Sequence, residues 1–390
     1  MMQPFDSWLT NTLRPFFGLL PLEEAWDILE IREGYFVCMD GDIIRKRISV
    51  SEQAYQEDDV HILTRNREVI LPLTARGKEK KMNYTHISAI KADGILFSAG
   101  IHARQEQSGY ILARNPRTYI SLPLPCVKHL TSKMEIIKWL EEYPSHLPAD
   151  YDLKLDKFKN MKSLRYKSVP GDIFRVEIDL FTDGYVLVVG DLRQMQKDGL
   201  FTKDSLWNNV MTMPLFIRTY LFKTADRSPT LDEITSTPLS ERTWIVMDDH
   251  FMRGGYEKVG HKPLTEADIQ LPIGYGRTIN YGEETRYRLS WGTGTVSKAE
   301  QDTSFKSETR FSNYGVSVGV SDDWFNPVAE HRASSNSLEH PLYHAERTLV
   351  LAEFGLPEDI SYDEFNRQTG GLTRAEYLEY LAKTYSRTRK

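Results

Sequence analysis

The chain has 390 residues, of which 40% are hydrophobic and 27% are charged, and its formal net charge is −6. A chain of this length accommodates about two or three domains, and the composition is that of a globular protein rather than a disordered or fibrous one. Because there is no basic excess, the charge argues against duplex nucleic acid as a partner for the chain as a whole.

The sequence predicts neither a membrane span nor a secretion signal. No apolar run approaches the roughly 18 residues that cross a bilayer, and Asp6, Asn11 and Arg14 interrupt the apolar residues near the start. Cys38 and Cys126 lie far apart, so neither a disulfide framework nor a zinc cluster is predicted. We therefore expect a cytoplasmic protein.

Short strands dominate the first third of the chain. From residue 28 to about 125, apolar segments alternate with turn signals such as Glu33-Gly34, which is the spacing of hairpins. Two segments, residues 62–73 and 111–124, share the pattern Ile-Leu, Arg-Asn and Leu-Pro-Leu. They are two similar hairpins, or a duplicated β unit that presents two arginines on one surface.

A basic cluster lies between these two segments. Residues 75–86 carry four cations and an aromatic side chain, a pattern that is usually a solvated loop but also suits phosphate groups. One alternative function is therefore a nucleic-acid-binding module in the first half, which would use Arg65, Arg76, Lys78, Lys80, Lys81 and Arg114.

A helix and a linker are predicted next. Ser132 and Glu135 have the spacing of a capping box, an apolar face follows, and Pro144 ends the helix. The polar, lysine-rich stretch after it, punctuated by prolines, is the best candidate for an inter-domain linker. We therefore predict a mainly β domain over residues 1–145, a linker over 146–165 and a second domain over 166–390.

The second domain is predicted to open on a hairpin at residues 169–193. Phe174, Val176 and Ile178 alternate with polar residues, and residues 185–189 are apolar at every position, so the second strand is expected to be covered on both faces. Asp183-Gly184 is the predicted turn.

Further strands, turns and helices are predicted along the rest of the chain. Strands are expected at residues 214–222, 243–247 and 287–291, with a hairpin turn at Gly254-Gly255 and a glycine-rich loop over 272–282. Helices follow at the C-terminus, where Ser361 with Glu364 and Thr373 with Glu376 form capping boxes. The predicted class is α+β, with two domains that each combine a mainly antiparallel sheet with a few flanking helices.

Few residues suggest catalysis. Asp248-Asp249 and Asp322-Asp323 follow predicted strands, where they can be turn residues, an acidic binding rim or paired carboxylates for acid–base or magnesium chemistry. His340 and His344 are one helical turn apart, but the glutamate that follows the first histidine of a metalloprotease helix is absent, and Pro341 starts the helix after His340. We predict no catalytic residue, no metal site and no cofactor.

Several fragments of the second half resemble a known family. In order, they are PGDIFRVEI, DGYVLVVGDL, YEKVGHKPL, LPIGYG and FGLPEDISYDEFNRQTGGLTRAEYLEYL. This succession resembles the immunity protein 26 family of bacterial polymorphic toxin systems over about residues 164–381, with insertions around 194–240 and 295–337. The resemblance implies an α+β domain that binds and neutralises a toxin without catalysis. It does not extend to residues 1–150, where a second binding module is expected by analogy only.

The predicted function is therefore that of a cytoplasmic immunity protein. Its partner would be a cognate toxin domain, for example a nuclease, whose basic cleft would attract an acidic surface. The predicted partner-binding residues form an acidic rim with an aromatic anchor, namely Asp248, Asp249, Asp322, Asp323 and Trp324. Besides the nucleic-acid-binding module, the other alternative is a metal- or carboxylate-dependent hydrolase that uses His340, His344 and the acidic pairs.

Overall fold

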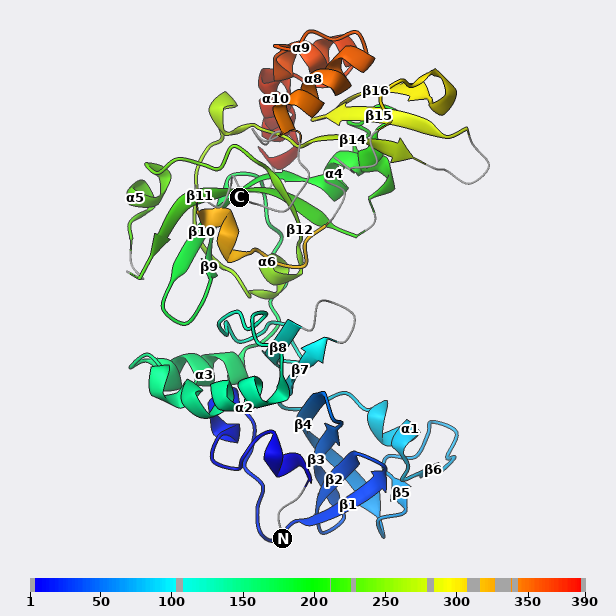
Figure 1. The fold of residues 1–390 in the computed structure, drawn as a ribbon, viewed down its shortest axis with the longest axis vertical. Coiled ribbons are helices and arrows are strands. Elements are labelled where there is room, and N and C mark those ends of the chain that lie inside the picture. The colour runs from blue at the N-terminus through cyan, green and yellow to red at the C-terminus, as the bar shows by residue number, and fades with distance from the viewer. Residues whose placement is uncertain are drawn as a thin grey trace. The chain divides into compact units, whose positions relative to one another are not determined.

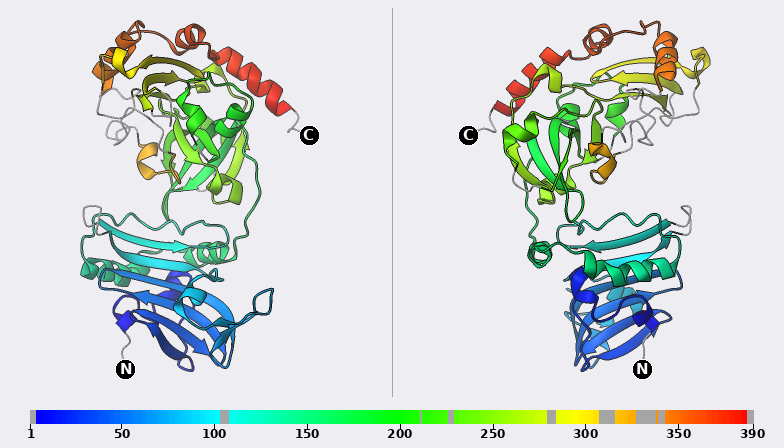
Figure 2. Two further views of the ribbon diagram at one scale, coloured as in Figure 1. Left: turned by 90° about the vertical axis from the view of Figure 1, so that its right-hand side faces the viewer. Right: turned by 60° about the vertical axis from the view of Figure 1, so that its left-hand side comes forward.

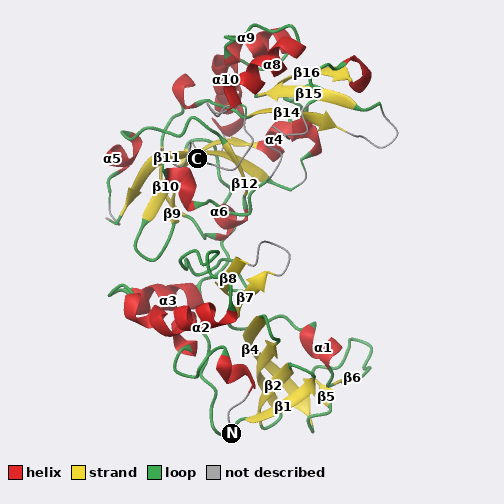
Figure 3. Ribbon diagram, in the orientation of Figure 1, coloured by secondary structure: helices red, strands yellow, loops and turns green. Residues whose placement is uncertain are grey.

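The computed structural model describes residues 4–102, 108–210, 212–225, 229–278, 284–306, 316–326, 338 and 343–386. The chain divides into two compact units. Unit 1 comprises Met1–Ser163 and Asp179–Phe181, and unit 2 comprises Leu164–Ile178 and Thr182–Lys390. Both units combine helices with antiparallel sheet, which confirms the predicted α+β class (Figures 1 and 3). No helix within the described ranges combines the length and apolar character needed to cross a membrane.

Unit 1 is built on an eight-stranded antiparallel sheet. Its strands follow the order β1 to β6 along the sheet, and β7 joins through β4 and carries β8 on its other side. Strand β4 therefore pairs with three strands, β3, β5 and β7. The strands are β1 (Asp27–Arg32), β2 (Tyr35–Asp40), β3 (Ile43–Val50), β4 (Ala54–Arg65), β5 (Val69–Ile70), β6 (Lys80–Lys81), β7 (Leu96–His102) and β8 (Ser108–Arg114).

The helices of unit 1 close its core. They are α1 (Tyr84–Ser88), α2 (Lys133–Glu142) and α3 (Tyr151–Asn160), with 3-10 turns η1 (Pro4–Ser7), η2 (Arg14–Phe17) and η3 (Tyr143–His146). The capping box of Ser132 and Glu135 forms at the start of α2, as predicted. Helix α3 lies inside the stretch predicted as a linker, because its Tyr151 and Phe158 are buried in the core of this unit.

A five-stranded sheet with β10 at its centre organises unit 2. The strands are β9 (Asp172–Glu177), β10 (Asp183–Asp191), β11 (Pro214–Thr224), β12 (Trp244–Met247) and β13 (Glu257–His261), in the order β12-β11-β10-β9-β13. Alternate residues of β10 enter different hydrophobic clusters: Leu187 and Val189 lie in one, and Val186 and Val188 in the other. The prediction that this strand is covered on both faces is confirmed.

The second sheet of unit 2 carries the C-terminal helices. It consists of β14 (Ile273–Thr278), β15 (Arg286–Trp291) and β16 (Gly294–Ala299). Figure 2 shows this sheet in yellow beside α8 (His344–Glu353), α9 (Tyr362–Thr369) and α10 (Arg374–Tyr385). The remaining elements are α4 (Leu192–Lys197), α5 (Leu231–Thr235), α6 (Asp249–Arg253), η4 (Leu206–Asn209), η5 (Glu266–Asp268), η6 (Glu300–Asp302) and η7 (Asp322–Phe325).

Three local predictions in unit 2 were wrong. Asp183-Gly184, predicted as the turn, is instead the start of β10. The loop that connects β9 to β10 comes before it, over residues 178–182. Gly254-Gly255 follows a short helix, since Gly254 adopts a left-handed φ of 83° that ends α6. The glycine-rich stretch over 272–282 contains β14, because pairing with β15 holds it extended. A glycine in the sequence favours a turn or a loop. Whether it lies in a turn, at a helix end or in a strand depends on the segments that pair with it.

The burial of β10 yields a first prediction. Val188→Asp places a carboxylate at a fully buried position, so we expect unit 2 to lose about 4 kcal/mol or more of stability. Hydrogen exchange of the full chain should show peptides of β9 to β11 losing protection while those of unit 1 keep it. Val259→Asp, the same change at an exposed position of β13, should leave protection unchanged. A stable Val188→Asp variant would contradict the role given to this strand.

Candidate partner-binding site

The two predicted acidic pairs lie at opposite ends of strand β12. Asp248 and Asp249 follow its last residue and begin α6. Asp322 and Asp323 begin η7, whose Trp324 stacks on Trp244, the first residue of β12, with ring centroids 4.0 Å apart. Four residues of extended chain span about 13 Å. The structure therefore does not gather the two pairs into one cluster.

Trp324 belongs to the core of unit 2. Its side chain is only 7% exposed, and its backbone carbonyl accepts a hydrogen bond from Thr219 Oγ1 at 2.6 Å. The ring fills the cluster on the outer face of the five-stranded sheet together with Phe325. Trp324, the predicted aromatic anchor, is therefore mostly buried, and it fixes η7 to the sheet.

The acidic side chains that start η7 and α6 form surface ion pairs. Asp322 accepts from Lys223 Nζ at 2.8 Å, and Asp249 accepts from Arg253 Nε at 2.9 Å. Exposed pairs of this kind contribute about 0 to 1 kcal/mol each. They orient the carboxylates without adding much to stability, so these groups remain accessible to a partner.

A group of carboxylates does gather at one end of the five-stranded sheet. Strands β10 and β12 both pair antiparallel with β11, so they run in the same direction and end on the same side. Asp191 ends β10, opposite Leu215, and Asp248 follows the residue that pairs with Pro214. We call this group the acidic end; it consists of Asp191, Asp198, Asp248 and Asp249.

Burial and neighbouring carboxylates both raise pKa values within the acidic end. Partial burial raises the pKa of Asp248, and the charges of Asp249 and Asp191 raise it further. Burial also raises the pKa of Asp191, where Asp198 adds to the effect and Lys167 opposes it. A cationic partner would relieve this repulsion. Asp191 and Asp198 were missed from the sequence, because only strand pairing brings them to the other two.

A second polar cluster centres on Asp172, the first residue of β9. Its carboxylate is fully buried and accepts four hydrogen bonds. The donors are Lys258 Nζ at 2.7 Å, His261 Nδ1 at 2.9 Å, Tyr166 Oη at 2.6 Å and Val169 N at 3.1 Å. Because an ionised carboxylate only accepts, the ring of His261 carries a proton on Nδ1. The cluster holds edge strand β13 and the segment before β9 together.

The charge of Asp172 is stabilised by these donors. Burial by itself would raise the pKa of this carboxyl, but the hydrogen bonds from Lys258, Tyr166 and His261 outweigh it, and the pKa lies below its usual value. Gly171 makes the approach of His261 possible, since a Cβ there would lie 2.6 Å from the ring atom Cε1.

A pocket of about 420 Å³ opens beside His261. Its wall is mostly apolar and comes from the β13 side and from α10, with Pro170, Leu264, Leu378, Leu381 and Tyr385. Carboxylate–histidine pairs serve as general bases in enzymes. Here the same carboxylate is also bound by Lys258 and Tyr166, so the arrangement is suited to fixing the shape of this edge.

The structure also locates the residues of the two alternative functions. Arg114 aligns through Leu96 with Asp58 of β4, seven positions from Arg65, or about 23 Å along the strand. The two arginines therefore do not share one surface. Arg65 forms an ion pair with Glu79 in the exposed basic loop. His344 is exposed, its Nε2 3.9 Å from Glu358, and His340 lies outside the described residues. Within the described part, no three or more His, Cys, Asp or Glu side chains are arranged so that they could hold a metal ion.

The Asp172 cluster yields a second prediction. The pKa of Asp172 is lower in the folded state than in the unfolded state, where it is about 3.9. Its ionised form therefore stabilises the fold above about pH 3.9, and this contribution is lost as the pH falls through the pKa of the folded state. Asp172→Asn should therefore cost about 3 kcal/mol at pH 7, and the difference from wild type should shrink below about pH 4. Urea unfolding between pH 3 and 7 measures it. The exposed change Asp359→Asn is the control; a pH-independent difference would argue against this account.

Comparison with known proteins links this region to a family. No match is found among the curated proteins or the solved structures. Residues 169–283 match the family model of immunity protein 26. The matched segment begins at the hairpin of β9 and β10 and includes Asp172, His261, Asp191 and Asp248. The resemblance seen in the sequence is thereby confirmed over residues 169–283, which are similar to the immunity protein 26 family.

Proposed function

We propose that this protein is an immunity protein that binds a toxin and blocks its activity, without carrying out a reaction itself. The observation that carries the proposal is the family match over residues 169–283, which spans the five-stranded sheet of unit 2. Cys38 and Cys126 are both free thiols, which fits action in the reducing cytoplasm of the cell that needs protection.

The acidic end is our proposed contact surface for the toxin. It concentrates four carboxylates whose mutual repulsion a basic partner would relieve. Met213 lies beside them, with its carbonyl 3.3 Å from the amide of Asp248 and its side chain 53% exposed. An exposed apolar side chain with a charged rim is the usual composition of a binding hot spot.

Charge complementarity points to the class of toxin. A nuclease must attract a polyanion, so its active cleft is basic. Carboxylates that enter such a cleft occupy the positions of phosphate groups and exclude the substrate. The negative field of the acidic end would also accelerate association, and this acceleration should weaken as salt is added. The predicted pair Asp322 and Asp323 lies at the other end of β12 and is not needed for this contact.

The function is tested by co-expression with the toxin domain encoded beside this gene. Growth should be restored only when both proteins are present, and the two should purify as a complex. If growth is not restored and no complex forms, the proposed function is wrong. This experiment does not depend on which surface makes the contact.

The contact surface is tested by a pair of charge-removing variants. Asp248→Asn with Asp249→Asn should weaken toxin binding at least tenfold at low salt, mainly through slower association, because the attractive field is lost. Glu358→Gln with Asp359→Asn removes the same charge from an exposed site elsewhere on unit 2 and should leave binding unchanged. Surface plasmon resonance at two salt concentrations measures both. Equal effects of the two pairs would place the contact elsewhere.

A further inference from the structure

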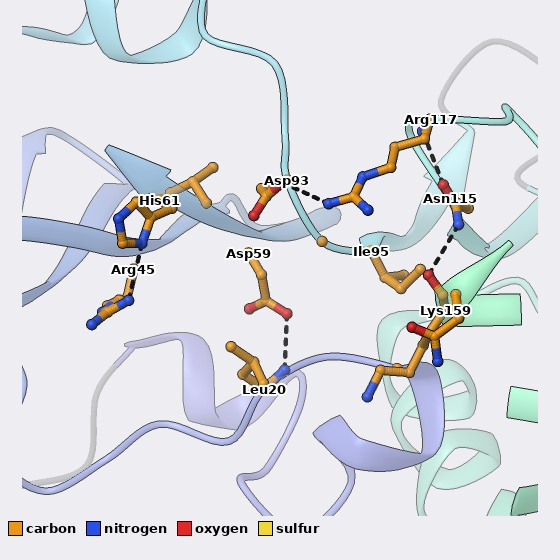
Figure 4. A pocket seen from close by; sticks show the side chains of 13 residues that line it. Leu20, Arg45, Asp59, His61, Asp93, Ile95, Asn115, Arg117 and Lys159 are labelled. Carbon is orange, nitrogen blue, oxygen red and sulfur yellow. Dashed lines mark hydrogen bonds and ion pairs between the residues drawn. The ribbon is translucent and has the colours of Figure 1, made fainter. Parts of the chain in front are cut away.

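Unit 1 contains a polar pocket that the proposed function does not use. Its volume is about 300 Å³, and it is lined by residues from the end of η2 and the loop after it, from β3 and β4, from the segment before β7, from the loop after β8 and from the end of α3. Figure 4 shows Arg45 and His61 on one side, Asn115, Arg117 and Lys159 on the other, and Asp59 between them. The question is which charge the pocket presents to a ligand.

Asp59 adds little net negative charge to the pocket, because a buried lysine and a backbone amide bind its carboxylate. Its carboxylate accepts from Lys46 Nζ and from Leu20 N, the latter at 2.9 Å. Lys46 also lies 2.5 Å from Glu57, which in turn binds Arg14 Nε at 3.1 Å. The four side chains alternate in sign and are almost wholly buried. Two cations and two carboxylates therefore cancel within the wall.

Most of the exposed charges around the pocket are paired as well. Arg117 binds Asp93 at 2.7 Å, and Arg45 binds Asp40 at 2.8 Å. Lys159 differs, since its ammonium forms no ion pair among the residues that the structure describes. The lining therefore carries one positive charge in excess.

A buried asparagine positions the cations on that side. Asn115 is 2% exposed, and its Nδ2 donates to the carbonyls of Phe158 and Lys159, at 2.9 and 3.4 Å. Its Oδ1 accepts from the amide of Arg117 at 2.9 Å. One buried side chain thus fixes the backbone of both Lys159 and Arg117. Asn115 thereby joins the two backbone segments from which Lys159 and Arg117 line the pocket.

The opposite side of the pocket adds a neutral donor. Arg45 Nη1 lies 3.1 Å from His61 Nδ1. An arginine can only donate, so Nδ1 accepts and the proton of the neutral ring is on Nε2. The pocket therefore has donor groups on both sides, from Arg45 and His61 on one and from Arg117 and Lys159 on the other.

We propose that this pocket binds a small anion, a carboxylate or a phosphate group, at the Lys159–Arg117 side. Lys159 supplies the uncompensated charge, and Arg117 supplies guanidinium donors beyond the one that binds Asp93. Such planar donors suit the oxygen atoms of either group. Unit 1 thereby acquires a ligand-binding role of its own, independent of toxin binding by unit 2.

The proposal is tested by titrating the full chain with inorganic phosphate and, separately, with succinate at low ionic strength. Isothermal calorimetry should show saturable binding of at least one of them. Tighter binding of phosphate would identify a phosphate ester as the ligand class, and tighter binding of succinate a carboxylate. If neither anion binds saturably, the proposal is wrong.

Two lysine variants on the same helix separate a site from general attraction. Lys159→Gln should weaken binding of the preferred anion at least tenfold, whereas Lys157→Gln, which removes an exposed charge outside the pocket, should change it less than twofold. Thermal unfolding should be the same for both variants and wild type, since both side chains are exposed. If the two variants weaken binding equally, the anion is attracted by the net charge of the helix, and the site does not exist.

Discussion

The burial of strand β10 on both faces is the constraint on which unit 2 depends. Residues 185–189 of this strand are apolar on both faces and lie between two cores. One core includes residues of the second sheet and the C-terminal helices, and the other includes residues of α6 and η7. Because β10 is central, the strands on either side of it have fixed directions. The ends of β10 and β12 then meet on one side, and this is where the acidic end forms.

The polar clusters of unit 2 follow from the same arrangement. Asp172 opens β9, next to the central strand, and edge strand β13 reaches it with Lys258 and His261. A buried carboxylate must be satisfied by donors, so this contact specifies where the edge strand lies. The acidic end has the opposite character, because its carboxylates repel one another and lack enough cations. The first cluster is satisfied within the fold, whereas the second is better suited to a partner.

Unit 1 contains a row of buried charges that pair with one another. Its alternating chain of Arg14, Glu57, Lys46 and Asp59 crosses the interior with each charge beside its opposite. Leaving any one of these four buried charges without its partner would destabilise the fold by about 3 to 5 kcal/mol. The pairing is complete enough that the pocket wall at Asp59 is nearly neutral. The properties of the pocket are consequently decided by its rim, where Lys159 is the charge without a partner among the described residues.

The sequence by itself determined much of the local structure and the resemblance to the immunity protein 26 family. Strand alternation, the capping box at Ser132 and the apolar run in β10 depend on neighbours along the chain, and the order of motifs in the second half sufficed to indicate immunity protein 26. Predictions from the sequence were wrong where contacts with distant residues override the local preference for a turn or a loop, as at Gly254 and in β14. Only the tertiary structure decided that Trp324 is buried, that Asp191 joins Asp248, and that Asn115 positions Lys159. Each of these contacts joins segments far apart in sequence, and strand pairing and burial, which no local pattern encodes, bring them together.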